Sequence, residues 1–345
     1  MTTTPGRLAI AVTGLRKSYG DQVVLDGIDL AVPEGTIFSL LGPNGAGKTT
    51  VVQILSTLIN ADGGDLRVAG HDLATDPDAV RAAIGVTGQF SAVDNLLTGT
   101  ENLLLMADLH HLGRAAGRRR AAELLRQFDL ADAAGKLAGT YSGGMRWRLD
   151  LAMTLVGNPR LIFLDEPTTG LDPRSRQTMW QIVRDLAASG ITILLTTQQL
   201  EEADELADRI ALLDHGRIVA EGTADELKRR IPGGHIELRF AARPELESAG
   251  RLLAATSRNE EAMTLQVPGD GNVPALRALL NQLDGASIKV EGLSIHTPDL
   301  DDVFFAFTGQ PDDSARHDSD RHDSDRHDSD RHDSARRDPQ KAALS

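Results

Sequence analysis

From residue 9 to about residue 222, short apolar segments alternate with amphipathic or polar segments of helical periodicity. The runs LIFL (161–164) and ITILL (191–195) do not alternate with polar residues, which is typical of strands covered on both faces of a parallel sheet. We therefore predict an α/β domain built on a parallel sheet. The predicted strands are Ala9–Thr13, Ile37–Leu41, Ile84–Thr87, Leu161–Leu164, Ile191–Thr196 and Ile210–Leu213.

Two local signals interrupt this alternation. Between Thr98 and Asp150 the pattern is helical, and Thr98 followed by Glu101 predicts a capping box ahead of the run NLLLMADL. The segment Asp214–Arg217 lies between two apolar runs and predicts a hairpin turn.

The pattern changes after Gly222, where we predict a small α+β domain over residues 235–309, beyond a boundary near residues 230–234. Its predicted elements are strands Ile236–Phe240, Met263–Val267 and Ile288–Gly292, with helices Ala275–Leu283 and Leu300–Phe307. Residues 316–335 repeat RHDSD with no apolar residue except a final alanine, so they have nothing with which to form a core. We interpret residues 311–345 as a disordered, charged tail whose histidines form a solvated spacer rather than a metal site.

Composition narrows the class of protein. The chain has 345 residues, 41% of them hydrophobic, and a formal net charge of −14, of which the tail contributes only a small part. An acidic protein of this kind is not expected to bind nucleic acid directly. The absence of cysteine excludes disulfides and thiolate metal sites. We find neither a signal-peptide pattern nor an apolar run of the roughly 18–20 residues that span a bilayer. If the protein works at a membrane, we expect another chain to supply the membrane-spanning segments.

The segment GPNGAGKT fits the phosphate-loop pattern G-x-x-x-x-G-K-[ST] completely, and it lies between the apolar strand IFSLL and a helical run. In such a loop, glycines let successive backbone N–H groups face the phosphates. Lys48 would reach the β- and γ-phosphates, and the Thr49 hydroxyl would bind Mg²⁺. The predicted ATP-binding residues here are Gly42, Pro43, Asn44, Gly45, Ala46, Gly47, Lys48, Thr49 and Thr50.

The apolar strand Leu161–Leu164 runs directly into Asp165 and Glu166. A carboxylate at the end of such a strand lies beside the phosphates, where Asp165 can hold Mg²⁺ directly or through water. Glu166 is then positioned to polarise the attacking water as a general base. Together with the phosphate loop, this pair predicts a magnesium-dependent nucleotide hydrolase.

The segment TYSGGMRWRLDLA is a second anion-binding signal, because its Ser-Gly-Gly turn leads straight into a helix N-terminus. With the phosphate loop and the carboxylate strand in this order, residues 8–225 resemble the ATP-binding-cassette (ABC) ATPase family. The resemblance implies a P-loop NTPase fold: a RecA-like parallel-sheet core with an antiparallel β subdomain and a helical subdomain.

The resemblance also implies roles for individual residues. Ser142, Gly143 and Gly144 match the family signature, which binds the γ-phosphate of ATP held by a second ATPase unit. Tyr19 matches the residue that stacks on adenine, Gln89 the glutamine that contacts the metal or the water, and Asp172 an aspartate of the dimer seam. Because the chain has one phosphate loop and one signature, a homodimer is the economical arrangement.

Gln198 departs from the family pattern, which usually has a histidine there. Glutamine keeps a hydrogen-bond donor but never carries a charge, so we expect hydrolysis to persist, mainly through Glu166, with weaker pH dependence. TTQQLEEADELADRI and the C-terminal LDDVFFAFTG resemble the ATPases of daunorubicin-type antibiotic-resistance exporters.

That subfamily resemblance implies a cytoplasmic ATPase bound to the inner face of the membrane, with a polytopic permease docking on Phe90–Leu97. The alternatives are an importer ATPase, or a soluble ABC ATPase that acts on nucleic acid or ribosomes. The latter usually has two cassettes or a long coiled-coil insertion, and neither is present in this sequence.

Overall fold

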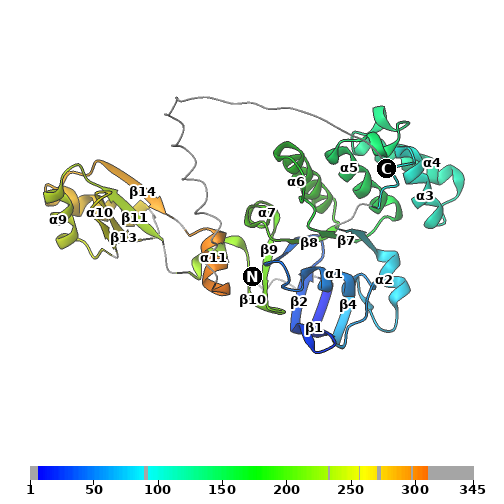
Figure 1. The fold of residues 1–345 in the computed structure, drawn as a ribbon, viewed down its shortest axis with the longest axis horizontal. Coiled ribbons are helices and arrows are strands. Elements are labelled where there is room, and N and C mark those ends of the chain that lie inside the picture. The colour runs from blue at the N-terminus through cyan, green and yellow to red at the C-terminus, as the bar shows by residue number, and fades with distance from the viewer. Residues whose placement is uncertain are drawn as a thin grey trace, which may run out of the picture. The chain divides into compact units, whose positions relative to one another are not determined.

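The computed structural model describes residues 7–88, 92–231, 234–255, 257–269, 273–296 and 298–309. Its largest sheet has six strands in the order β10-β9-β3-β8-β7-β6. Figure 1 labels β10, β9, β8 and β7 of this sheet. All neighbouring pairs in it are parallel except β9 and β10, which form an antiparallel hairpin. The strands are β3 (Ile37–Leu41), β6 (Ile84–Thr87), β7 (Leu161–Asp165), β8 (Thr192–Thr197), β9 (Arg209–Asp214) and β10 (Arg217–Gly222).

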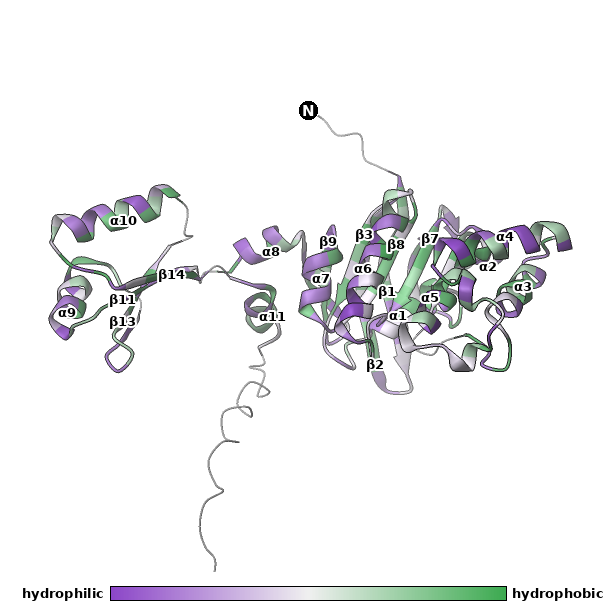
Figure 2. Cartoon of the chain, turned by 90° about the horizontal axis from the view of Figure 1, so that it is seen from above, coloured by the Kyte–Doolittle hydropathy of each residue, from purple (hydrophilic) through white to green (hydrophobic). Residues whose placement is uncertain are grey.

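Both faces of this sheet are covered, which explains the apolar runs without alternation. On β7, Ile162 and Leu164 belong to one buried cluster, whereas Leu161 and Phe163 belong to another. Side chains alternate across a strand, so the two clusters lie on opposite faces. Figure 2 shows the central strands β3 and β8 as hydrophobic.

One of these clusters is shared with a four-stranded antiparallel sheet of order β2-β1-β4-β5. Its strands are β1 (Leu8–Tyr19), β2 (Gln22–Pro33), β4 (Gly63–Val68) and β5 (His71–Asp72). The predicted strand Ala9–Thr13 is the first part of β1, while β2 has no counterpart among the strands predicted from the pattern.

The other cluster contains the helices that follow β6 and β7. The helices of the sequence up to residue 231 are α1 (Lys48–Leu55), α2 (Pro77–Ala83), α3 (Gly99–Leu109), α4 (Arg114–Gln127), α5 (Gly143–Thr154), α6 (Pro173–Ala188), α7 (Leu200–Leu206) and α8 (Ala224–Arg229). The capping box predicted at Thr98 and Glu101 is present at the start of α3. The predicted hairpin turn after β9 is also confirmed.

Residues 235–296 form a β-α-β-β-α-β arrangement with sheet order β12-β13-β11-β14. The elements are β11 (His235–Arg239), α9 (Arg243–Leu252), β12 (Ser257–Asn259), β13 (Thr264–Pro268), α10 (Val273–Gly285) and β14 (Gly292–His296). Ile236, Leu238 and Leu265 contribute to a separate buried cluster.

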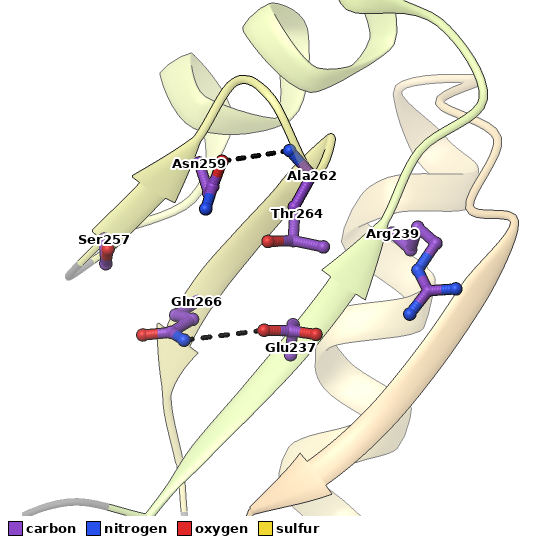
Figure 3. A pocket seen from close by; sticks show the side chains of 7 residues that line it. All are labelled: Glu237, Arg239, Ser257, Asn259, Ala262, Thr264 and Gln266. Carbon is purple, nitrogen blue, oxygen red and sulfur yellow. Dashed lines mark hydrogen bonds between the residues drawn. The ribbon is translucent and has the colours of Figure 1, made fainter. Parts of the chain in front are cut away.

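The side chains that alternate with this cluster form a polar face of the sheet. Glu237, Ser257 and Gln266 are among the residues that line a shallow hollow of about 430 Å³ there (Figure 3). The Gln266 amide donates to the Glu237 carboxylate at 3.5 Å, across the register pair that joins β11 and β13. This alternation is that of a sheet with one packed and one solvated face.

Two predictions for the C-terminal region are wrong. Residues Ile288–Gly292 do not form a strand, because the Ile288 amide donates to the carbonyl of Leu283 at the end of α10. Ile288 is buried as part of this connection, and β14 begins only at Gly292. The alternating apolar residues Ile288 and Val290 therefore belong to a loop that packs on the core of the small domain, and not to a strand.

The last helix packs elsewhere than predicted. α11 (Leu300–Thr308) contains the predicted helix, but it does not join the cluster of the small domain. Leu300 and Val303 lie instead in a cluster with Leu41, Ala203 and Leu227, which belong to β3, α7 and α8. The small domain is thus an insertion between α8 and α11, rather than a domain that extends to residue 309.

Several predictions fall outside the described residues. They concern Gln89, the first two residues of the segment Phe90–Leu97, and the tail 311–345. No helix in the described part of the chain has the length and apolar character that crossing a bilayer requires.

Candidate functional site

The phosphate loop connects β3 to α1, and its glycines are required by its path. Gly45 and Gly47 have φ values of 82° and 108°, which disfavour any other residue. A Cβ on Gly42 would lie 2.2 Å from the carbonyl oxygen of Leu213. The loop is closed by Lys48, whose ammonium donates to the carbonyls of Gly42 at 2.8 Å and Pro43 at 3.1 Å.

Asp165 lies at the end of β7, beside the start of α1. The hydroxyl of Thr49 donates to its Oδ1 at 3.3 Å, and the hydroxyl of Thr196 donates to the same oxygen. Asp165 is only 5% exposed. A hydroxyl and a carboxylate therefore converge from α1 and β7, as the sequence analysis expected.

Glu166 has a left-handed backbone, with φ of 50°. Its amide donates to the Thr196 carbonyl at 3.1 Å, which ties the turn to the neighbouring strand β8. Its carboxylate lies 3.6 Å from the Lys48 ammonium. Burial lowers the pKa of Lys48, while the attraction of Glu166 opposes that shift and favours the charged amine.

Lys48, Thr49 and Glu166 line one hollow of about 550 Å³. It is bounded by Val24, Asn44, Gly45, Gly47, Lys48, Thr49, Thr50, Glu166, Thr169 and Gln198. The structure thus brings Glu166 and Gln198 together over the phosphate loop. We call this the phosphate hollow.

Four other residues of this region that were predicted to bind ATP are not among those that line the hollow: Gly42, Pro43, Ala46 and Tyr19. Ala46 is buried, and its carbonyl accepts from the Gly216 amide at 3.2 Å. Tyr19 is 51% exposed, with the Lys17 ammonium 5.4 Å from its ring centre, and it is not among the residues that line the phosphate hollow. Val24 and Thr169 do line it, although neither was predicted from the sequence as a site residue.

Ser142 caps α5, as its side chain accepts a hydrogen bond from the Met145 amide at 3.2 Å. It lines a second hollow of about 280 Å³, which we call the signature hollow. Gly144 is required here because a Cβ would lie 2.7 Å from the Ser175 hydroxyl. Gly143 has no atom within 4 Å of such a Cβ and is exposed.

Asp172 caps α6, whose residues Arg174 and Ser175 line the signature hollow. Its carboxylate accepts from the amides of Arg174 at 3.1 Å and Ser175 at 3.0 Å, and from the Ser175 hydroxyl at 2.6 Å. The Ser175 hydroxyl is the main cause that holds the pKa of Asp172 below its ordinary value. Because Ser175 also touches Gly144, the caps of α5 and α6 are held together.

The signature hollow and the phosphate hollow share no lining residue. The phosphate hollow offers a lysine, the carboxylate of Glu166 and a glycine-rich loop. The signature hollow offers a helix N-terminus with a serine. A clustered set of three or more His, Asp or Glu side chains of the metal-binding kind does not occur among the described residues. The fold and the phosphate loop define a P-loop nucleotide hydrolase, and the serine and glycine predicted to form a second phosphate contact lie at a separate hollow.

Comparison with known proteins gives the family. The model of the family described as "ABC transporter" matches residues 25–169. The chain is 49% identical over 318 residues to the daunorubicin/doxorubicin resistance ATP-binding protein DrrA of Streptomyces peucetius, covering 91% of this chain and 96% of that protein. It is 37% identical over 305 residues to the Nod factor export ATP-binding protein I of Ralstonia nicotianae, covering 87% and 94%.

A solved structure titled as the ATP binding subunit of an ABC transporter matches with a TM-score of 0.58 and 30% identity, covering 65% of this chain and 93% of that one. Another, an ATP-binding cassette in its ADP conformation, matches with a TM-score of 0.59 and 25% identity, covering 64% and 92%. The chain belongs to the ATP-binding subunits of ABC transporters, and it is an ATPase.

Proposed function

We propose that this ATPase energises the export of a drug or antibiotic through a separate membrane-spanning permease. Its relatives include a doxorubicin resistance ATP-binding protein of Mycobacterium tuberculosis, 46% identical over 90% of this chain, as well as the Nod factor export protein. The observation that carries the mechanism is the pair of hollows with no residue in common. A transported compound would contact the permease rather than these residues.

The two hollows complement each other if two copies of the chain face one another. The phosphate hollow of one copy would hold ATP, and the Ser142 hydroxyl and α5 N-terminus of the second copy would close over the γ-phosphate. Amides at a helix N-terminus and its dipole favour a negative charge at that position. ATP would thus join the two copies, and its hydrolysis would release them.

The donor set fits a magnesium ion. The Thr49 hydroxyl and the Asp165 carboxylate are hard oxygen ligands within 3.3 Å of each other, and Mg²⁺ in nucleotide sites takes one or two such ligands together with phosphates. Gln89, which lies outside the described residues, is proposed as a further contact. When bound, the ion would neutralise charge on the phosphates.

In this mechanism Glu166 accepts the proton of the attacking water, Lys48 binds the β- and γ-phosphates, and Gln198 donates a hydrogen bond to the γ-phosphate. Glu166 and Gln198 border the same hollow, as these roles require. Tyr19 would stack on adenine at its edge, and Asp172 would hold the dimer seam through its cap on α6. Glu166→Gln should reduce turnover at least about 100-fold while ATP still binds. Unchanged turnover would contradict the role of Glu166.

We place the permease contact at the segment between β6 and α3, on the inner face of the membrane. Among the described residues of this segment, Leu96 presents a large apolar side chain that is 83% exposed. Its neighbours are held in place: the Leu97 carbonyl accepts from the Ala138 amide, and the Asn95 carbonyl accepts from the Gly139 amide. Residues 138 and 139 lead directly to Ser142, so a permease on this segment would contact the arm that carries the signature.

Affinity purification from membranes tests this proposal. We expect a polytopic permease to copurify with the wild-type chain, to stimulate its ATP turnover, and to be lost on Leu96→Asp. The matched control is Leu58→Asp, since Leu58 is also exposed, at 67%, but lies after α1. Recovery of ribosomes or nucleic acid, or substrate uptake that depends on this ATPase, would favour the alternatives and contradict export.

A further inference from the structure

Glu202, on the first turns of α7, is a carboxylate at an unusual position. It is fully buried, with 0% of its surface exposed. Within the described structure neither of its carboxyl oxygens has a hydrogen bond of regular geometry. Burying such a group costs several kcal/mol unless partners compensate, so its presence calls for an explanation other than packing.

Its neighbours come from three segments that each lead to a site residue. Burial raises the pKa of Glu202, while the nearby donors of Thr197, Thr168 and Trp180 and the charge of Arg176 oppose that rise. The Trp180 and Arg176 Nε atoms also lack partners in the described structure. Buried donors on α6 and a buried acceptor on α7 are therefore left without regular hydrogen bonds in the same part of the described structure.

Thr197 connects this carboxylate to the phosphate hollow. Its hydroxyl accepts from the Gln199 amide at 2.9 Å, which leaves its own O–H free to donate toward Glu202. Its carbonyl accepts from the amide of Gly42 at 3.2 Å, at the start of the phosphate loop. Gln198 lies in sequence between Thr197 and Gln199, which the hydrogen bond from the Gln199 amide joins. The position of Gln198 therefore depends on Thr197.

Thr168 and α6 provide the other connections. Thr168 lies two residues after Glu166, and its carbonyl accepts from the Leu171 amide at 3.1 Å, in the loop that leads to Asp172. Arg176 and Trp180 lie on α6, which Asp172 caps. One buried carboxylate thus borders the segments that carry the general base, the γ-phosphate contact and the dimer seam.

We propose that Glu202 is a positioning residue, which draws the donors of Thr197, Thr168 and Trp180 onto one carboxylate and so fixes Gln198 relative to Glu166. This inference rests on the proposed catalytic roles of Gln198 and Glu166. It does not require Glu202 to touch the nucleotide.

Stability and turnover separate this role from a structural one. A leucine at position 202 removes a buried charge and replaces it with apolar volume, which is often neutral or stabilising. We expect Glu202→Leu to keep or raise the melting temperature of the full chain and to leave KM for ATP within about twofold. Its kcat should fall about 100-fold, the scale expected for a misplacement of about 1 Å in an active site.

Glu202→Gln keeps the shape and one acceptor oxygen, so it should recover much of the lost turnover. The matched control is Glu205→Gln, on the same helix, where the exposed carboxylate pairs with Arg184 at 3.1 Å; its kcat should stay within about twofold of the parent. Parental kcat in Glu202→Leu would overturn the proposal. So would a fall in kcat that is accompanied by a higher KM and a lower melting temperature, because general damage to the fold would then explain it. If Glu202→Leu does not fold, Glu202→Met, which also removes both acceptor oxygens and is unbranched like glutamate, decides: parental kcat in that variant overturns the proposal, and a lower kcat at parental KM supports it.

A double-mutant cycle with Gln198→Ala identifies the residue through which Glu202 acts. If Gln198→Ala lowers kcat, adding the Glu202 substitution should cause little further loss, whereas multiplicative losses would contradict the proposal. A Gln198→Ala variant with parental turnover would instead contradict the proposed function of Gln198. If Gln198→Ala lowers kcat but Glu202→Leu keeps the parental kcat, the proposal for Glu202 is contradicted and the role of Gln198 stands.

Discussion

Replacing Leu300 with alanine removes an apolar side chain from the cluster that joins α11 to the nucleotide-binding part of the chain. Leu300 is 2% exposed and shares this cluster with Leu41, directly before the phosphate loop, and with Ala203 on α7. A buried leucine truncated to alanine typically costs about 2–5 kcal/mol, because transfer free energy is lost and a cavity remains. At roughly 2–4 °C per kcal/mol for domains of 150–250 residues, the melting temperature should fall by at least about 4 °C.

Tryptophan fluorescence reports this transition selectively. The chain has two tryptophans, Trp147 on α5 and Trp180 on α6, and both lie in the nucleotide-binding part. The control is Leu238→Ala, which truncates a fully buried residue of the small domain in a cluster that shares no member with that of Leu300. We expect Leu300→Ala to lower the tryptophan-detected midpoint and Leu238→Ala to leave it nearly unchanged.

An unchanged midpoint in Leu300→Ala would refute the reasoning, since α11 would then add nothing to the stability of the ATPase core. An equal decrease in Leu238→Ala would refute it too, because the two clusters would then unfold as one.

Other variants test separate parts of the site. Tyr141→Phe removes a hydroxyl that donates to the buried Ala133 carbonyl at 2.7 Å, so urea unfolding should show a loss of about 1–3 kcal/mol. Gln198→His should give turnover a pH dependence between about pH 6 and 8 that the parent lacks, because imidazole titrates there; a pH–rate profile measures this. Asp172 has a lowered folded-state pKa, so its contribution to stability is present above its unfolded pKa of about 3.9 and is lost as pH falls through the lower folded value. Asp172→Asn should therefore reduce the acid dependence of the urea midpoint, and an unaltered dependence would contradict the assigned cap.

The phosphate loop could be predicted from sequence because its chemistry is contiguous. Eight consecutive residues that lead from a strand into the first turn of a helix determine both the path of the backbone and the position of Lys48. Asp165 and Glu166 were predictable for a related reason, since they follow an apolar strand whose end must lie beside that loop in a parallel sheet. The signature needed the resemblance to the family, because a Ser-Gly-Gly helix cap alone has no fixed ligand.

What sequence patterns missed depends on contacts between distant segments. The apolar face of α11 predicts a buried helix but does not say which core buries it. Ile288 and Val290 alternate as strand residues do, yet they pack beneath the small sheet as a connection. Glu202 reads as one of several acidic residues on a polar helix, and only its complete burial distinguishes it from Glu205.

ATP-driven association of the Glu166→Gln variant tests the central claim, which is that two copies share each nucleotide. Two further substitutions in that background separate charge from capping, because asparagine and aspartate both cap helices as well as serine does. Sedimentation velocity should show monomers without ATP and dimers with ATP for the parent variant and for Ser142→Asn. Ser142→Asp should bind ATP yet stay monomeric, because its carboxylate would face the γ-phosphate. Dimers of Ser142→Asp at the same ATP concentration, or no ATP-dependent dimer of the parent variant, would contradict the account.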